Sequence, residues 1–205
     1  MQKILKIARK IREKIYLSET GLLLYVDLDN YQSQSDNELE SDFHWGFSYD
    51  VDAILDFYTK HSWSPFKKSR RKSFEETLKK GYRCFTLYDN EKNIIGTTWI
   101  GFNKTHFNKF IKRKLKDSVK ENEFLYIWAT LVDSSKRGLG HGQVMNQKLF
   151  NTLKKEIGRK YVCSQVDIKN SPSLGYHFRS GFQLYGIVFR KRFFMYFKSS
   201  ELILK

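Results

Sequence analysis

The 205-residue sequence is poor in the residues that mark secreted, fibrous or multidomain proteins. It contains only two cysteines, Cys84 and Cys163, and neither belongs to a metal-ligand spacing. This argues against a disulfide framework or a metal site and predicts two buried free thiols in a reducing cytoplasm. Only two prolines occur and there is no low-complexity tract, so the chain lacks the signs of a linker. We expect a single domain over residues 1–205.

Long apolar runs are also missing. No stretch reaches the ~18 apolar residues of a membrane-spanning helix, and Met1–Leu17 interleaves its charges with apolar residues, unlike a secretory signal. We therefore expect a soluble, cytoplasmic protein. The apolar residues of Met1–Leu17 recur at helical spacing, which predicts a basic amphipathic helix. Such a helix either docks on the protein, which we favour, or makes peripheral contact with an anionic membrane.

Acidic residues are scarce relative to basic ones. The sequence has 22 Asp and Glu against 37 Lys and Arg, a formal net charge of +15. Nucleic acid, anionic lipid, a nucleotide-linked substrate or coenzyme A would each satisfy this charge, and so would a solvated lysine-rich surface. The charge therefore selects no function by itself. The hydrophobic content of 40% is enough for a sizeable core.

The most informative stretch is Phe124–Gly142. Its first nine residues are apolar, aromatic or β-branched and predict a buried strand, and the pattern over His141–Gly158 predicts a helix. Between them lies a loop with glycines at 138, 140 and 142. Glycines let a ligand approach the backbone, and the free N–H groups at a helix start carry partial positive charge. The stretch predicts an anion site, with phosphate the most natural ligand.

Two signatures in this region resemble those of the GNAT N-acetyltransferase superfamily. The first is R-x-x-G-x-G at Arg137–Gly142, and it lies between the predicted strand and helix. The second begins at Asn170, after the predicted strand Lys160–Ile168, and ends with the pair Gly181-Phe182. Together they cover residues 124–182. The chain departs from the family pattern at Ser134, where proline is frequent, and at His177, where tyrosine is frequent.

The pattern along the chain predicts an α/β (α+β) fold in the order β-α-α-β-β-β-α-β-α-β-β, a mixed sheet flanked by helices. This is the order that the GNAT resemblance implies, with a parallel strand pair across the helix after the glycine loop. The remaining predicted strands are Gly21–Asp29, Tyr82–Tyr88, Ile94–Phe102, Phe182–Arg190 and Arg192–Lys198, and the remaining helices are Val51–Lys60, Ser69–Lys80 and a short one after Asn170. Residues 103–122 form a basic insert, either a surface helix or a lid near the acceptor site.

The resemblance implies an acetyl-coenzyme A-dependent N-acetyltransferase that uses direct transfer and no metal. It implies cofactor contacts from the central strand, the loop and the start of the next helix and strand: Thr130, Leu131, Val132, Arg137, Gly138, Leu139, Gly140, His141, Gly142, Gln143 and Asn170. A backbone N–H near Leu131 or Val132 would polarise the acetyl carbonyl.

The resemblance also implies an acid that protonates the leaving thiolate and a base that deprotonates the amine. We expect His177 to be the acid, with Tyr176 as the alternative. The competing interpretation is that both only pack around the cofactor. Glu123 is the first candidate base, and Glu121 and Asp133 are substitutes.

The acceptor stays open at this stage. The resemblance implies a small-molecule primary amine, such as an amino sugar or an amino acid, and the positive charge suits an anionic acceptor. Trp63, Phe66, Trp99 and Trp128 either line a pocket or belong to the core. The rival hypothesis is a non-enzymatic binding module of the same fold whose basic faces hold nucleic acid or membrane. The intact glycine loop favours the transferase, and we do not expect nucleic acid to be the partner.

Overall fold

The computed structural model describes residues 16–32, 43–62, 70–102, 124–193 and 197–204. The first fifteen residues of the predicted N-terminal helix, the basic insert 103–122 and the candidate base Glu123 lie outside the described residues, as do Trp63 and Phe66. Tyr16 and Leu17 do not continue a helix: they begin the first strand. Within the described residues, no helix is long and apolar enough to cross a membrane.

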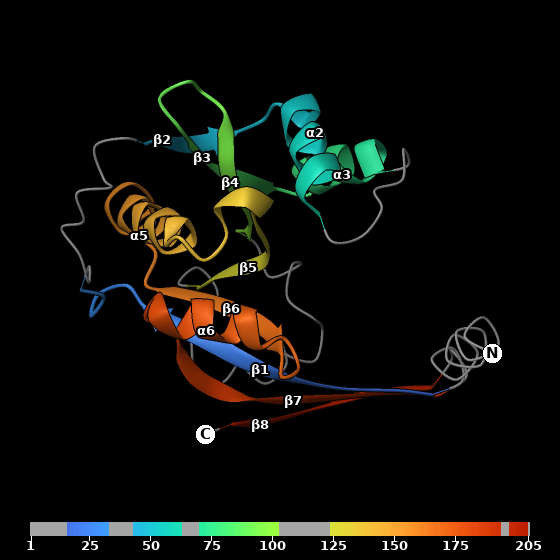
Figure 1. Cartoon of the computed structure of the whole chain (residues 1–205). Coiled ribbons are helices and arrows are strands. Elements are labelled where there is room, and N and C mark those ends of the chain that lie inside the picture. The colour runs from blue at the N-terminus through green and yellow to red at the C-terminus, as the bar shows by residue number, and fades with distance from the viewer. Residues whose placement is uncertain (1–15, 33–42, 63–69, 103–123, 194–196, 205) are drawn as a thin grey trace.

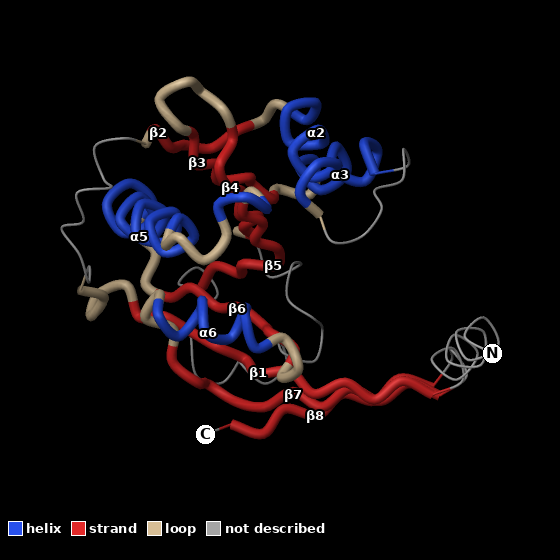
Figure 2. The backbone as a smooth tube through the Cα atoms, viewed as in Figure 1, coloured by secondary structure: helices blue, strands red, loops and turns tan. Residues whose placement is uncertain are grey.

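In the described part of the chain, eight strands form one sheet in the order β2-β3-β4-β5-β6-β1-β7-β8, and four α-helices accompany it (Figures 1 and 2). The strands are β1 (Tyr16–Asp27), β2 (His44–Ser48), β3 (Tyr82–Tyr88), β4 (Ile94–Gly101), β5 (Phe124–Val132), β6 (Tyr161–Asp167), β7 (Gln183–Phe193) and β8 (Phe197–Leu204). The helices are α2 (Val51–His61), α3 (Arg70–Lys79), α5 (His141–Thr152), which continues as the π-helical turn η5 (Leu153–Ile157), and α6 (Ser171–Arg179).

The predicted fold is confirmed, including the parallel pair β5–β6, while every other neighbouring pair in the sheet is antiparallel. One strand was missed in the sequence. The edge strand β2, HWGFS, is only five residues long and contains a glycine, so its alternation is too short to stand out. It pairs with β3 and precedes α2, which begins at the N-cap Asp50.

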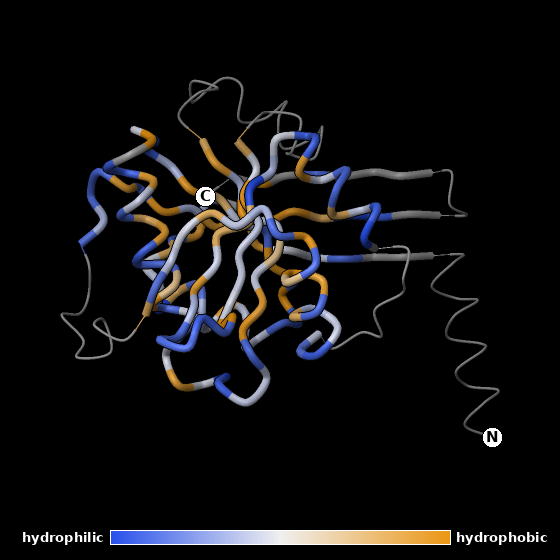
Figure 3. Tube along the Cα trace, turned by 90° about the horizontal axis from the view of Figure 1, so that it is seen from above, coloured by the Kyte–Doolittle hydropathy of each residue, from blue (hydrophilic) through white to orange (hydrophobic). Residues whose placement is uncertain are grey.

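Helices α5 and α6 pack on one face of the sheet and α2 and α3 on the other. The core on the α5 side joins three parts of the chain: Leu24, Val26 and Leu28 of β1, Phe85 and Leu87 of β3, and Met145, Leu149 and Phe150 of α5. The core on the opposite face joins Ile54, Phe57 and Tyr58 of α2 and Phe74 of α3 to Cys84, Trp99 and Leu131 of the sheet. In Figure 3, hydrophobic segments run through the strands and helices, and most of the outer turns are hydrophilic.

A β-bulge in β5 alters the faces of this central strand. Trp99 of β4 pairs with Ala129 and Ile100 pairs with Ile127, which leaves Trp128 as an extra residue. The Trp128 side chain is 44% exposed and packs edge-on against Tyr82. A bulge inserts one residue into a strand and therefore exchanges its two faces beyond that point.

The exchange determines which β5 side chains approach α5. Before the bulge, Leu125 and Ile127 belong to the core beneath α5. After it, Ala129 and Leu131 join the core beneath α2 and α3, and Thr130 turns toward α5, where its hydroxyl lies 3.0 Å from that of Thr98. The bulge thus brings a threonine to a position that the unbroken alternation of the sequence would assign to the other face.

Cys84 and Cys163 are buried free thiols, as predicted. Burial raises the pKa of Cys84 to about 12 and raises the pKa of Cys163 still further. Because the thiolate is the reactive form, we expect neither cysteine of the native protein to react with a thiol reagent such as DTNB at pH 8, and both to react after unfolding. Rapid reaction of the native protein would contradict this burial.

Candidate functional site

A cavity opens between β5 and β6, where these parallel neighbours separate. They pair only from Phe124 to Ile127 on β5, so within the described residues the β6-facing edge of residues 128–132 has no strand beside it. The cavity has a volume of about 740 Å³. Its walls come from residues 127–132 of β5, residues 164–167 of β6, the glycine loop and α6. This gap leaves backbone hydrogen-bonding groups of β5 available to a ligand.

The orientation of these backbone groups follows from the end of β5. The Asp133 N–H donates to the Ile95 carbonyl of β4 at 2.9 Å, so Asp133 faces β4. Because successive residues of a strand turn their N–H and C=O groups to opposite sides, Leu131 also faces β4, and Thr130 and Val132 face the gap. Of the two predicted carbonyl-polarising residues, Val132 therefore offers its N–H to the cavity and Leu131 does not.

The glycine loop ends at the cavity mouth. Gly138 and Gly140 have φ angles of 82° and 87°, a left-handed conformation that other residues adopt at a cost. Within the described part of the chain, no hydrogen bond uses the backbone N–H groups from Gly138 to Gly142. Leu139 between them is 61% exposed. The loop therefore presents unpaired donors at the positive end of the α5 dipole.

Gly142 has a different structural role from Gly138 and Gly140. A Cβ at this position would lie 2.8 Å from Cε2 of Tyr176, closer than real side chains approach. Gly142 therefore lets α5 pack directly against the Tyr176 ring of α6. The sequence pattern does not reveal this contact, because it groups all three glycines with the ligand loop.

The charge around the cavity favours an anion. Among the lining residues, Lys136, Arg137 and Arg179 are cationic and Asp167 is the one carboxylate. The side chain of Gln143 joins α5 to α6 at the cavity mouth. Its amide nitrogen donates to the Gly140 carbonyl at 3.3 Å, and its amide oxygen accepts a hydrogen bond from Nε of Arg179 at 3.1 Å. The net positive lining agrees with a phosphate ligand.

Arg137 and His61 connect the glycine loop to α2. The Arg137 guanidinium donates to the carbonyl oxygens of Val132 (3.1 Å) and His61. The Ser134 N–H donates to Nδ1 of His61 at 3.1 Å, and Asp133 Oδ1 lies 3.3 Å from the same nitrogen. The C-terminal end of α2 and the start of the loop thus hold each other in place.

Asp133 is poorly suited to the role of a base. Burial alone would raise its pKa, but hydrogen bonds from Ser135 and the neighbouring His61 and Lys136 outweigh burial, and the pKa of the Asp133 carboxyl is lowered. A carboxylate with a lowered pKa holds a proton weakly. Its contacts instead stabilise the turn before the loop.

The contact between His61 and Ser134 can be tested by substitution. We expect His61→Leu to weaken the binding of a loop ligand by about 5- to 10-fold, because it removes one hydrogen-bond acceptor worth ~1 kcal/mol from the loop support. His61→Asn should largely restore binding, since the amide oxygen of asparagine lies where Nδ1 of histidine does. Equal binding by the leucine variant and the wild type, measured by calorimetry, would show that this contact does not support the loop.

Asn170 and Tyr176 line the cavity from α6. Asn170 caps this helix through a hydrogen bond from the Ser173 N–H to its side-chain oxygen at 3.2 Å, which leaves its amide nitrogen available to a ligand. The Tyr176 hydroxyl is buried and, within the described part of the chain, has no hydrogen-bond partner of normal geometry. Burial raises its pKa, although the nearby Thr130 and Asn146 side chains lower it in part. Both polar atoms of the Asn146 side chain are likewise buried without a partner.

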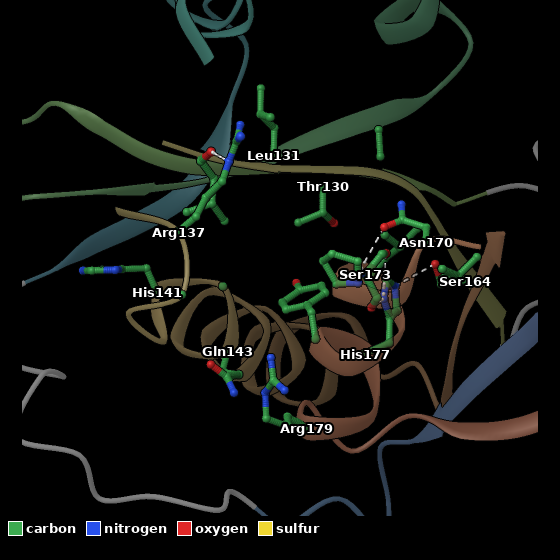
Figure 4. A pocket seen from close by; sticks show the side chains of 18 of the residues that line it. Thr130, Leu131, Arg137, His141, Gln143, Ser164, Asn170, Ser173, His177 and Arg179 are labelled. Carbon is green, nitrogen blue, oxygen red and sulfur yellow. Dashed lines mark hydrogen bonds between the residues drawn. The ribbon is translucent and has the colours of Figure 1, made fainter. Parts of the chain in front are cut away.

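The two histidines near the site point in different directions (Figure 4). His177 is buried, and its Nδ1 lies 2.7 Å from the Ser173 carbonyl oxygen and its Nε2 lies 3.0 Å from Oγ of Ser164. His141 points away from this group, and its Nδ1 lies 3.2 Å from the Lys136 carbonyl oxygen. Of the tryptophans, Trp99 belongs to the core and Trp128 lines the cavity.

Sequence reasoning missed Ser164 and Asn146. Ser164 interrupts a run of alternating valines, Val162 and Val166, on the face of β6 that packs beneath α5. A lone polar residue in an apolar alternation is a detectable signal. Asn146 offers a similar one, since it lies in α5 next to the core residue Met145 and is 1% exposed.

Comparisons with known proteins agree with this geometry. A profile of the Acetyltransferase (GNAT) family matches residues 48–182, and no curated protein matches the sequence. Similar solved structures include a tandem GNAT protein from the clavulanic acid biosynthesis pathway (17% identity, TM-score 0.56, 85% of this chain and 53% of that one). A GCN5-related N-acetyltransferase from Sphaerobacter thermophilus is similar at 14% identity and a TM-score of 0.60, over 93% of this chain and 56% of that one.

The chain thus spans about half the length of these two proteins. A third structure, AAC(6')-Iy in complex with the bisubstrate analog CoA-S-monomethyl-acetylneamine, covers 69% of this chain and 90% of its own, at 14% identity and a TM-score of 0.50. These identities establish the fold alone. Since the family profile covers well over half of the sequence and includes both the glycine loop and the Asn170 helix, the chain belongs to the GNAT family of acetyltransferases.

Proposed function

We propose that the protein transfers an acetyl or other acyl group from coenzyme A to a primary amine by direct attack, in the cavity between β5 and β6. The observation that carries this proposal is the unpaired edge of β5 at Thr130 and Val132, which faces the cavity directly above the glycine loop. An extended ligand can add to such an edge as another strand would. Coenzyme A has a pyrophosphate for the loop and an extended amide-containing arm for the edge.

The loop and its neighbours fit the phosphate part of this ligand. The N–H groups of Gly138 to Gly142 would donate to the pyrophosphate, and Lys136 and Arg179 would contribute positive charge at the cavity mouth. The Arg137 side chain supports the loop through backbone carbonyls, so its contribution is indirect. His141 points away, and its backbone N–H is the part that would contact the ligand.

The strand edge fits the pantetheine arm. The N–H groups of Thr130 and Val132 are the donors that can bind the arm or polarise the acyl carbonyl, and the amide nitrogen of Asn170 is a third donor on the opposite wall. The Leu131 side chain stabilises the core beneath α2 and α3 and takes no direct part in this role.

The geometry favours Tyr176 over His177 as the acid that protonates the leaving thiolate. The Ser173 carbonyl can only accept, so the neutral His177 ring carries its proton on Nδ1, where the proton is engaged. The Tyr176 hydroxyl has no competing partner, and its raised pKa keeps it protonated at neutral pH. Since a raised pKa also makes a weaker acid, the nearby Thr130 and Asn146 would be needed to stabilise the tyrosinate.

The base and the acceptor belong to the amine side of the reaction. Glu123 precedes the first residue of β5 and stays our candidate for deprotonating the amine. Trp128 offers an exposed aromatic face at the cavity, next to the bulge, which suits an acceptor with an apolar or sugar face. The similarity to a protein solved with a bisubstrate analog supports a small-molecule acceptor. The positive charge of the chain suits an acceptor that also carries an anionic group.

A screen of amine acceptors that measures released coenzyme A thiol tests this function. We expect thiol release from acetyl-coenzyme A to rise severalfold with at least one amine, and the matching amide product to be detected by mass spectrometry. A protein that binds coenzyme A but acetylates no amine in a broad screen of amino sugars, amino acids and polyamines would contradict the transferase. Binding of DNA or RNA at physiological salt without binding of coenzyme A would instead support the non-enzymatic module.

A further inference from the structure

A serine and a histidine that the proposed transfer does not use form a hydrogen-bonded pair inside the cavity. Ser164 lies on β6 and is 3% exposed, His177 lies on α6 and is 4% exposed, and both line the cavity. Oγ of Ser164 is 3.0 Å from Nε2 of His177 (Figure 4). On the other side of the ring, Nδ1 is 2.7 Å from the Ser173 carbonyl oxygen. The imidazole is therefore held at both nitrogens.

These contacts determine the protonation of the ring. A carbonyl oxygen accepts and cannot donate, so Nδ1 carries the hydrogen, and Nε2 of the neutral ring has a free lone pair directed at the Ser164 hydroxyl. Burial lowers the pKa of His177 and so keeps the ring neutral at physiological pH. Nε2 is thus available to accept the Ser164 proton.

This arrangement has the three parts of an activated nucleophile. A hydroxyl lies within hydrogen-bond reach of a base, and a third group orients that base. In this protein the orienting group is a backbone carbonyl, which fixes the tautomer but does not neutralise an imidazolium by charge. We therefore expect a slower reaction than a carboxylate-supported triad would give.

The position of Ser164 brings its hydroxyl close to the proposed thioester path. Ser164 pairs with Ile127, which is the last paired residue of β5 before the two strands separate. The hydroxyl is thus at the apex of the gap, and the unpaired N–H groups of Thr130 and Val132 lie a few residues further along β5. Thr130 is the nearer of the two along the strand, and its N–H is the donor that we expect to stabilise an oxyanion formed at a carbonyl attacked by Ser164.

We propose that Ser164 is a nucleophile and His177 its base, and that they give the protein a second activity: hydrolysis of acyl-coenzyme A through an acyl-Ser164 ester when no amine is bound. Oγ forms a bond to the thioester carbonyl carbon and its proton passes to Nε2 of His177. The C–S bond then breaks, and that proton passes to the sulfur of the leaving coenzyme A. Water next attacks the ester, Nε2 takes a proton from the water and returns it to Oγ, and the free carboxylic acid leaves.

This inference rests on the proposed function, because only bound coenzyme A brings a thioester to Ser164. The test uses the full chain with radiolabelled acetyl-coenzyme A and no acceptor amine, quenched in acid and mapped by peptide mass spectrometry, with released thiol measured in parallel. We expect an acetyl ester on the peptide that contains Ser164, together with steady thiol release. Hydroxylamine should remove the label, which distinguishes an ester from acetylated lysine.

Three variants separate the catalytic role from packing. Ser164→Ala should lose the label and lower thiol release by about 100-fold or more, the scale of a lost activated nucleophile. His177→Asn keeps a donor for the Ser173 carbonyl but has no base at Nε2, so it should also lose both signals. Ser180→Ala is the matched control: this buried serine lies at the end of α6 but does not line the cavity, so its removal should retain both the label and thiol release.

The outcomes distinguish this inference from the proposed function. In one outcome, calorimetry shows that acetyl-coenzyme A binds to the wild type, but no label appears and thiol release does not exceed the spontaneous rate. That outcome would overturn the role of Ser164 and would leave the proposed cofactor site intact. Label that persists in Ser164→Ala, for example on the adjacent Cys163, would also overturn it. No binding of acetyl-coenzyme A at all would overturn the proposed function and this inference with it.

Discussion

Replacing Gly140 with valine is expected to lower the affinity for coenzyme A by at least about 100-fold. The φ angle of Gly140 is 87°, and among the described residues beyond its chain neighbours an added Cβ would meet only the side-chain amide of Gln143, at 3.6 Å, so a side chain here would project into the cavity mouth. Valine would block the approach of the pyrophosphate to the loop N–H groups. Losing two charge-assisted hydrogen bonds at ~1.5 kcal/mol each corresponds to about that change in affinity.

Gly158 supplies a matched control for backbone strain. It also has a left-handed φ angle, 64°, and a Cβ there would meet nothing within 4 Å, but it follows η5 and does not line the cavity. Gly158→Val should therefore cost a similar ~1–2 kcal/mol of stability without changing coenzyme A affinity. If both variants fold and bind coenzyme A equally well, the glycine loop is not the pyrophosphate site.

Removing the Tyr176 hydroxyl is expected to have the largest effect on the chemical step of acetyl transfer. Tyr176→Phe should lower the single-turnover rate by about 10²- to 10⁴-fold, as for a lost general acid, with nearly unchanged acetyl-coenzyme A affinity. The ring packs against Gly142 and phenylalanine retains it, so the structure should be preserved. His177→Asn should change the transfer rate much less, because the proton on Nδ1 is bound to a carbonyl.

The comparison between these two variants is informative in both directions. A larger loss of transfer in His177→Asn would return the acid role to His177, as the sequence pattern suggests. Near-normal transfer in both variants would mean that solvent protonates the thiolate. Because its raised pKa keeps Tyr176 protonated across the accessible pH range, loss of this acid should lower the single-turnover rate at every pH without changing the shape of the profile.

Much of this fold follows from local patterns. The bounds of β5 and β3 agree with the predicted strands residue for residue, because segments rich in apolar, aromatic and β-branched residues there end at polar turn residues. Strand β1 begins earlier than predicted, at Tyr16. The predicted strand Arg192–Lys198 is wrong, because Arg192 and Phe193 end β7 and only Phe197 and Lys198 belong to β8, which continues to Leu204. Both extensions pair with β7 over polar stretches such as Ser18–Thr20 and Lys198–Ser200, where alternation carries little signal.

The geometry of the site depends on contacts that the sequence does not display. The position of α6 on the sheet determines whether Tyr176 or His177 faces β5. Gly142 and the valine-rich face of β6 set that position, because α6 packs against both. The bulge at Trp128, which turns Thr130 toward Tyr176, likewise arises from pairing with β4 across a long insert. The sequence therefore identifies the motif that contains Tyr176 and His177, but it does not show which of these two neighbours has the acid role.

The central claim is that coenzyme A binds along the β5 edge and the glycine loop, and an NMR titration tests it most directly. Addition of coenzyme A to ¹⁵N-labelled protein should shift the amide signals of Gly138, Gly140 and Gly142 and those of Thr130 and Val132, and should saturate at a dissociation constant between about 1 μM and 1 mM. The amide of Gly158, outside the cavity, should stay unshifted. Two results would contradict the account. Coenzyme A could shift the amide signals of other residues and leave those of the loop and the β5 edge unshifted, or it could fail to bind at millimolar concentration.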